Sequence, residues 1–167
     1  MGDPDMSLHQ AFLAGFTRRW HCNPELAHTD DRVDGHSARV ARIILMWHPE
    51  LSVALIAAAL RHDDGEMGIG DMCAPFKRAR PDIADALAKI EDSVRFKIWN
   101  SYDGDLTDTD AHWLVFADRL DALMWAAHHR ADLSRDGWAA SRAWLAGNAL
   151  ALDCHQQFEA LQRRMIK

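Results

Sequence analysis

Apolar residues recur at intervals of three and four along most of the chain, which is the pattern of helices that bury one face. Alternating runs of β-branched residues, which would indicate strands, are essentially missing. The expected helices cover residues 7–18, 35–47, 50–62, 81–99, 110–130 and 134–164. The pattern therefore predicts an all-α protein, a single compact bundle of about six helices in one domain over residues 1–167.

Local signals predict where several of these helices begin or break. Asp34 is suited to cap the second helix, Pro49 to open the third and Pro81 to open the fourth. A Thr-Asp-Thr cluster at residues 107–109 can cap the fifth helix, and Gly147-Asn148 is a weak point in the last. These signals predict the places at which the chain turns from one helix to the next.

Charge and cysteine content narrow the choice of partner and compartment. The formal net charge is −6, and the basic residues are spread along the chain, which argues against a nucleic-acid-binding face. No segment approaches the roughly eighteen uninterrupted apolar residues of a membrane span, and no apolar run near residue 1 resembles a secretion signal. Three cysteines without a CxxC pair indicate a reducing compartment. We therefore expect a cytoplasmic protein whose partner is a small molecule, neither nucleic acid nor membrane.

Several polar residues fall at positions where helical spacing places apolar neighbours. His36 shares a helix face with Val40, and His62 continues an apolar stripe into the last turn of the next helix. Asp63 follows where that helix frays, and Asp118 points to the apolar side of a later helix. A buried carboxylate costs several kcal/mol unless it is neutralised, ion-paired or bound to a metal. The four side chains therefore require partners, and they are well placed to find one in common.

Each of these residues alone has a structural explanation. A histidine on an apolar face is commonly a hydrogen-bonded core residue, and Asp118 can pair with Arg119 or with an arginine of another helix. Together, two inward imidazoles and two carboxylates suit a divalent transition metal such as Mn, Fe, Co, Ni or Zn, with positions left for water or substrate. The predicted metal ligands are His36, His62, Asp63 and Asp118. Asp121, one turn after Asp118, is the alternative to it.

In order and spacing these residues resemble the HD-domain metal-dependent phosphohydrolases, whose pattern is a His, an adjacent His-Asp pair and a distant Asp. Here the pattern reads His36 in DGHSARVA, His62-Asp63 in ALRHDDGE and Asp118 in FADRLDAL. The resemblance covers roughly residues 16–125. It implies the helical HD fold, a divalent metal held by the four side chains, and hydrolysis of a phosphate ester.

A narrower likeness is to the small HD proteins that act on deoxynucleotides, the bacterial 5′-deoxynucleotidases and the phage-encoded dATP triphosphohydrolases. RRW at 18–20 is similar to their Arg-Trp pair, in which arginine meets phosphate and tryptophan flanks the nucleoside. HDDGEMGIGDM at 62–72 is similar to their His-Asp-x-x-x-Glu followed by Gly-Asp, and APFK at 74–77 to the segment after it. The substrate-binding residues that this likeness implies are Arg19, Trp20, Pro75 and Lys77.

One segment departs from the deoxynucleotidase pattern. Those enzymes usually carry Pro-Thr-Pro where this chain has Cys73-Ala74-Pro75, so a hydroxyl is missing. The departure keeps two reactions open, release of phosphate from a deoxynucleoside monophosphate and release of triphosphate from a dATP-like substrate. A nucleotide-binding or sensor module that keeps the fold without turnover is the alternative from another class.

Two acidic residues after the His-Asp pair are candidates for the chemistry. Phosphate ester hydrolysis needs neutralised charge around the phosphoryl group and a nucleophile made from water. We assign Glu66 to orienting or deprotonating that water, or to holding a second divalent ion. Asp71 is the other candidate for acid-base catalysis or for the second ion. The glycines between them let the backbone turn close to the phosphates.

Other features have structural explanations. Lys77, Arg78 and Arg80 can form an ordinary solvated basic run, and Trp20 can be a core aromatic. The chain has seven tryptophans, several at helical spacing with methionines, a pattern more typical of a core or a subunit interface than of a cofactor site. We therefore expect a homo-oligomer.

Overall fold

The computed structural model describes residues 4–100, 106–135 and 137–165. Within these ranges the chain forms eight α-helices and one short 3-10 helix, and no strand. The elements are α1 (Pro4–Ala14), α2 (Val33–Trp47), α3 (Val53–Arg61), η1 (Asp64–Gly68), α4 (Ala74–Ala79), α5 (Pro81–Trp99), α6 (Asp108–His128), α7 (Trp138–Ala151) and α8 (His155–Met165). The all-α prediction is confirmed. None of the described helices is both long enough and apolar enough to cross a membrane.

The predicted count of about six helices is too low, and one reason lies at the end of the chain. The expected last helix is divided into α7 and α8. The break falls at Asp153, whose backbone is left-handed at φ 53°, and not at Gly147-Asn148, which lies inside α7. The Asn148 side chain donates to Trp144 O at 2.7 Å and bonds His112 of α6 at 2.5 Å. These bonds keep α7 continuous across the glycine.

Helix starts were predicted with mixed success. α2 begins at Val33 after Arg32, so Asp34 is not its cap, and α3 begins at Val53, so Pro49 does not open it. Ser52 precedes α3 instead, and its hydroxyl accepts from Leu55 N at 3.0 Å, a capping bond that proline has no side-chain acceptor to make. α1 also starts and ends earlier than residues 7–18.

The fourth and fifth expected helices are confirmed more closely. α5 spans Pro81–Trp99 with proline in its first turn. α6 spans Asp108–His128 and is capped by Thr107, whose hydroxyl accepts from Asp110 N at 3.0 Å. The short α4, which the hydrophobic pattern did not predict, adds the remaining extra helix.

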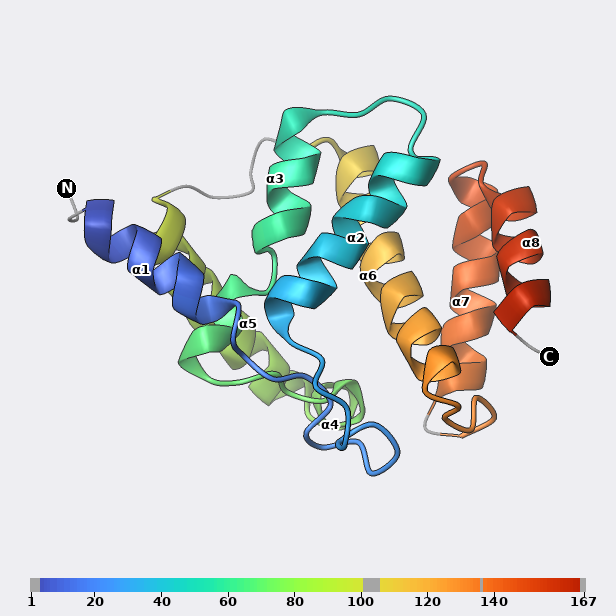
Figure 1. Cartoon of the computed structure of the whole chain (residues 1–167), viewed down its shortest axis with the longest axis horizontal. Coiled ribbons are helices and arrows are strands. Elements are labelled where there is room, and N and C mark those ends of the chain that lie inside the picture. The colour runs from blue at the N-terminus through green and yellow to red at the C-terminus, as the bar shows by residue number, and fades with distance from the viewer. Residues whose placement is uncertain (1–3, 101–105, 136, 166–167) are drawn as a thin grey trace.

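α6 is the central helix of the core. In Figure 1 it lies between α2 on one side and α7 on the other, and it packs against both as well as against α3 and α8. Its Trp113, Phe116, Leu120 and Leu123 are almost completely buried. Each such side chain stabilises the fold by about 1.5–3 kcal/mol. Residues on the inward face of α6 are therefore fixed in place by packing.

The irregular segment between α1 and α2 is tied back on itself. Arg18 and Arg32 form an isolated antiparallel bridge, and Arg19 N donates to Asp31 O at 3.1 Å. Val33 N, at the start of α2, donates to Thr17 O at 3.0 Å. These bonds hold Arg19 and Trp20 beside the first turn of α2.

Candidate metal centre

Four side chains from three parts of the bundle meet at one point. His36 lies near the start of α2, His62 directly follows the last residue of α3, Asp63 comes next, and Asp118 lies in the middle of α6. The side chain of His36 is fully buried, whereas that of Asp118 is 38 % exposed. The cluster is anchored in the core and opens to solvent on its α6 side.

The distances within this cluster fit a shell around one ion. His36 Nε2 lies 3.2 Å from His62 Nε2, 3.3 Å from an oxygen of Asp63 and 3.2 Å from an oxygen of Asp118. His62 Nε2 lies 3.4 Å from the other oxygen of Asp63. Nitrogen and oxygen ligands about 2.0–2.2 Å from one transition metal lie about 3.0–3.5 Å from each other in tetrahedral or octahedral geometry. His36, His62 and Asp118 in particular offer donors that are all mutually close.

Both histidines present the same nitrogen to the cluster. His36 Nδ1 lies 2.7 Å from Asp121 Oδ2, and His62 Nδ1 lies 2.9 Å from the backbone oxygen of Ala59. Acceptors at both Nδ1 atoms hold a proton there, so that the neutral form of each ring, which is the form that binds a metal, has its lone pair on Nε2. Asp121, the alternative ligand on α6, therefore lies behind His36 and orients its ring.

The titratable groups of the cluster shift one another's pKa values. Burial and the nearby Arg19 guanidinium oppose protonation of His36, yet hydrogen bonds with carboxylates, Asp118 foremost, raise the pKa of His36 well above its usual value. Burial opposes ionisation of Asp63, yet His62 and His36 hold the pKa of Asp63 well below its usual value. The carboxylates thus stay ionised and favour a cation among them.

Arg19 is a buried cation next to the cluster. Its side chain is 9 % exposed, and its guanidinium lies 3.4 Å from Asp31, 3.7 Å from Asp121 and 3.9 Å from Asp118. Burial disfavours the charge, but Asp63 and Asp118 outweigh it and raise the pKa of Arg19. The guanidinium is positioned to contact an anion bound at the open side of the cluster.

Trp20 is held in an unusual backbone conformation. Its φ is 65°, in the left-handed region that costs a residue other than glycine about 1–3 kcal/mol. Its backbone N donates to Asp71 at 3.2 Å, and its indole Nε1 donates to Asp31 at 2.8 Å. Its ring lies 6.0 Å from that of Trp138, between ring centres. Strain of this kind is concentrated at binding sites, which supports a role for Trp20 in recognition.

The turn of η1 directs Glu66 back toward the cluster. Glu66 N donates to Asp63 O at 2.9 Å, and Gly70 N donates to Glu66 O at 2.6 Å. Gly65 lies against α5 so closely that a Cβ there would be 2.3 Å from the backbone oxygen of Glu91. Gly70 has a φ of 81°, which favours glycine. Gly65 is therefore required by the approach of α5, and Gly70 by the backbone of the turn.

Glu66 is a buried carboxyl group without a full set of partners. It is 6 % exposed, and its Oε2 has no hydrogen-bond partner among the described residues. Burial, reinforced by the charges of Asp63 and Asp71, raises the pKa of Glu66 to about 9. A group this costly to bury is typical of a functional site.

The remaining predicted residues lie around this centre in different ways. Asp71 accepts from the Trp20 backbone, and Lys77 in α4 lies 3.2 Å from Glu91 of α5. Burial opposes the charge of Lys77, but Glu91 raises its pKa, and Glu66 and Asp71 add to the effect. Pro75 is exposed in the first turn of α4. Asp71 and Lys77 thus face the site, whereas no described contact joins Pro75 to it.

Sequence reasoning missed the residues that support the ligands. Arg39 of α2 donates to both Asp121 and Asp31, each at 2.7 Å. Asp64, for which the sequence indicated no role, is buried and accepts from Trp99 Nε1 at 2.8 Å, and burial raises its pKa to about 6. The only sequence signal for Asp121 was its spacing of one turn from Asp118.

The arrangement of two histidines, an adjacent aspartate and a distant aspartate is the one expected of an HD-type metal phosphohydrolase. A family model described as 5′-deoxynucleotidase YfbR-like matches residues 16–134, which is most of the chain. The chain therefore belongs to the YfbR-like 5′-deoxynucleotidase family, and the resemblance drawn from its sequence is confirmed. No curated protein and no solved structure matches it. Membership in this family implies a hydrolase with a divalent metal and a nucleotide substrate.

Proposed function

We propose that this protein hydrolyses the 5′-phosphate ester of deoxynucleoside monophosphates in a metal-dependent reaction. The observation that carries the proposal is the convergence of His36, His62, Asp63 and Asp118 in a chain of the YfbR-like family. When bound there, a divalent ion supplies Lewis acidity toward the phosphate and lowers the pKa of a water molecule. The four side chains hold it, and Asp121 and Ala59 O orient the two imidazoles.

In this proposal Glu66 orients the attacking water and takes its proton. Its pKa of about 9 keeps the carboxyl protonated at neutral pH, and the charge of a divalent ion held by the neighbouring ligands would favour its ionised form. Asp71 lies close enough to influence that pKa and is the second candidate for acid-base catalysis. The same two carboxylates are the candidates for a second divalent ion.

Substrate recognition falls to residues at the open side of the cluster. Arg19 contacts a phosphate oxygen, since its buried guanidinium lies 3.9 Å from Asp118. Trp20 flanks the sugar or base with one face, while Trp138 supports its ring. Lys77 adds positive charge at the same side, although it is bonded to Glu91. Pro75, exposed in the first turn of α4, is assigned to substrate binding by the family resemblance alone.

Product analysis tests this function. The purified protein is incubated with each deoxynucleoside monophosphate and triphosphate and with several divalent ions, and products are separated by ion-exchange chromatography. Inorganic phosphate from monophosphates, lost in His62→Ala and Asp63→Ala variants, supports the proposal. Nucleotide binding without turnover under any ion overturns it in favour of the sensor module.

The second candidate is a dATP-like triphosphohydrolase. The sequence Cys73-Ala74-Pro75 keeps it open, because the hydroxyl of the usual Pro-Thr-Pro segment is missing at the start of α4, which weakens the case for a monophosphatase. Release of inorganic triphosphate with no phosphate would establish this reaction instead. Elemental analysis of the same preparations identifies the metal.

Self-association is part of the proposal as well. Leu8, Phe12 and Phe16 lie at helical spacing at the start of the chain and are between 47 % and 72 % exposed. Apolar side chains gathered in this way are commonly covered by a second subunit. Sedimentation velocity with a Phe12→Asp variant tests whether they form the contact between copies.

A further inference from the structure

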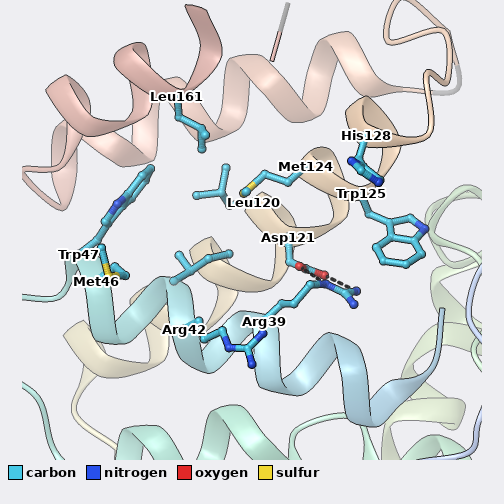
Figure 2. A pocket seen from close by; sticks show the side chains of 11 residues that line it. Arg39, Arg42, Met46, Trp47, Leu120, Asp121, Met124, Trp125, His128 and Leu161 are labelled. Atoms are coloured by element: carbon cyan, nitrogen blue, oxygen red, sulfur yellow. Dashed lines mark hydrogen bonds and ion pairs between the residues drawn. The ribbon is translucent and has the colours of Figure 1, made fainter. Parts of the chain in front are cut away.

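A second cavity lies behind the metal centre, between α2, α6 and α8. Its volume is about 540 Å³, within the range of small-molecule sites. Figure 2 shows Trp47 and Met46 at one end and the Arg39–Asp121 pair near the other, with Leu161 of α8 across from them. Asp121 and its partner Arg39 support the metal centre from one end of this lining, and the other lining residues have no part in the proposed reaction.

The lining of the cavity is mostly apolar and adaptable. Trp47 and Met46 come from α2, Met124 from α6 and Leu161 from α8. Tryptophan offers a flat apolar surface, and methionine fits irregular apolar shapes because its side chain is flexible and polarisable. Met46 is 78 % exposed, so part of this lining meets water at a cost. The lining therefore suits an apolar ring system or chain.

The charges around the cavity are unbalanced. Its carboxylate is Asp121, which is already bonded to Arg39 and His36. Arg42 is exposed at the cavity, and among the described residues it has no ion-pair partner. His128 adds a second nitrogen donor on the α6 side. The cavity thus combines an apolar lining with the positive charge of Arg42, which no group among the described residues pairs with.

We propose that this cavity binds a small amphipathic anion, with its apolar body against Trp47, Met124 and Leu161 and its anionic group at Arg42. A carboxylate, sulfonate or phosphate monoester on an aromatic or aliphatic body has the required chemistry. Charge complementarity favours this occupant over a second copy of the chain. Two copies that each carry a net charge of −6 repel one another, whereas a single anionic group matches the one arginine of the cavity. The site is independent of the phosphohydrolase reaction.

A pair of fluorescent probes tests the proposal. Anilinonaphthalenesulfonate has an apolar body and one anionic group, and phenylnaphthylamine is its uncharged counterpart. Titration of the folded, metal-free protein should give saturable binding of the anionic probe with one site per chain. Inorganic phosphate, which competes at Arg19, should leave this binding unchanged.

Two variants and a control locate the site. Arg42→Glu should weaken binding of the anionic probe about tenfold at low ionic strength and leave the uncharged probe unaffected. Leu161→Trp fills the cavity and should weaken both probes, with helical content checked by circular dichroism. Lys89→Glu, the same charge reversal on exposed α5, should change neither.

The possible outcomes distinguish a bound amphipathic anion from a second copy of the chain. Binding that is not saturable, or that Lys89→Glu weakens as much as Arg42→Glu does, overturns the proposal. Self-association that excludes the probe and is lost in a Met46→Asp variant overturns it in favour of an interface between copies. Because the test needs no metal and no turnover, its result is separate from that of the activity assays.

Discussion

The two walls of the metal centre differ in how their buried charges are paired. On the wall formed by α2 and α6, Asp121 is bonded to His36 and Arg39, and Arg39 in turn to Asp31. On the wall formed by η1, Glu66 is buried with an oxygen that has no partner among the described residues. The first wall fixes the positions of ligands, whereas the second holds a carboxyl group at a cost to stability, as expected of a group kept for chemistry.

The strongest test of the paired wall is Asp118→Asn. The amide keeps the size of the side chain but removes its charge, so metal affinity and turnover should both fall about a thousandfold. Equilibrium dialysis with the metal and initial rates with a deoxynucleoside monophosphate measure the two effects. Asp108→Asn, in the exposed first turn of the same helix, is the control and should leave both unchanged.

Glu66→Gln tests the wall with the unpaired carboxyl group, because it should change activity and stability in opposite directions. Activity should fall about a hundredfold or more, because the group that takes a proton is lost. The metal-free variant should nevertheless be more stable than the parent protein at neutral pH. If Glu66 contributed only to packing, the substitution would lower stability and activity together.

The gain in stability has a defined pH dependence. Folded Glu66 keeps its proton to about pH 9, whereas the unfolded chain releases it at the ordinary pKa of glutamate, about 4.3. Between these values folding takes up a proton, so the free energy of unfolding falls as pH rises, by up to about 1.4 kcal/mol per pH unit. The advantage of Glu66→Gln should therefore grow from pH 5 to pH 9 in urea unfolding with a chelator. The exposed Glu50→Gln variant is the reference. If the free energy of unfolding of Glu66→Gln changed with pH as steeply as that of the parent protein, this prediction would be contradicted.

Asp121→Asn should have an intermediate effect. The variant still accepts from His36 Nδ1 but leaves Arg39 without half of its carboxylate pairing. Metal affinity should fall about tenfold to a hundredfold, as is usual when the partner of a ligating histidine is changed. At saturating metal kcat should recover while KM stays unchanged, since the residue acts through His36. Permanent loss of kcat at every metal concentration would indicate a direct role in the reaction.

Two glycine substitutions give the smallest effects and opposite signs. Gly65→Ala should lower the free energy of unfolding by about 1–3 kcal/mol, because the new methyl group collides with the backbone oxygen of Glu91. Gly147→Ala, in the interior of α7 where a Cβ meets nothing within 4 Å, should raise it by about 0.5–1 kcal/mol. Denaturant unfolding measures both changes, and two values of the same sign would refute this reading of the packing.

The sequence predicted the meeting of His36, His62 and Asp118 because each interrupts an apolar helical face, and apolar faces turn toward a shared core. It did not separate the tasks of Asp118 and Asp121, since both lie on the inner side of α6 and only the position of His36 decides between them. That these residues bind metal, and that Glu66 and Asp71 take part in the reaction, stay predictions. The need for glycine at 65 was likewise invisible, because it depends on the approach of α5.

Helix ends show the same limit. Thr107 and Pro81 were recognised because their capping chemistry is local. Gly147-Asn148 was a predicted weak point, yet α7 continues through it. The Asn148 side chain bonds Trp144 within α7 and His112 of α6, and the second bond depends on how α7 packs against α6. Local chemistry predicts where a helix can end, and tertiary contacts decide whether it does.

The three-residue spacing of Asp118 and Asp121 has a consequence for how the family can diverge. One residue inserted between them turns the rest of α6 by about 100°. The insertion would remove the support of His36 and, because Met124 lies on the same segment, would also reshape the second cavity. Changes in chain length are therefore expected in the connections around α6, such as residues 129–135, while the helix keeps a constant number of residues in this stretch.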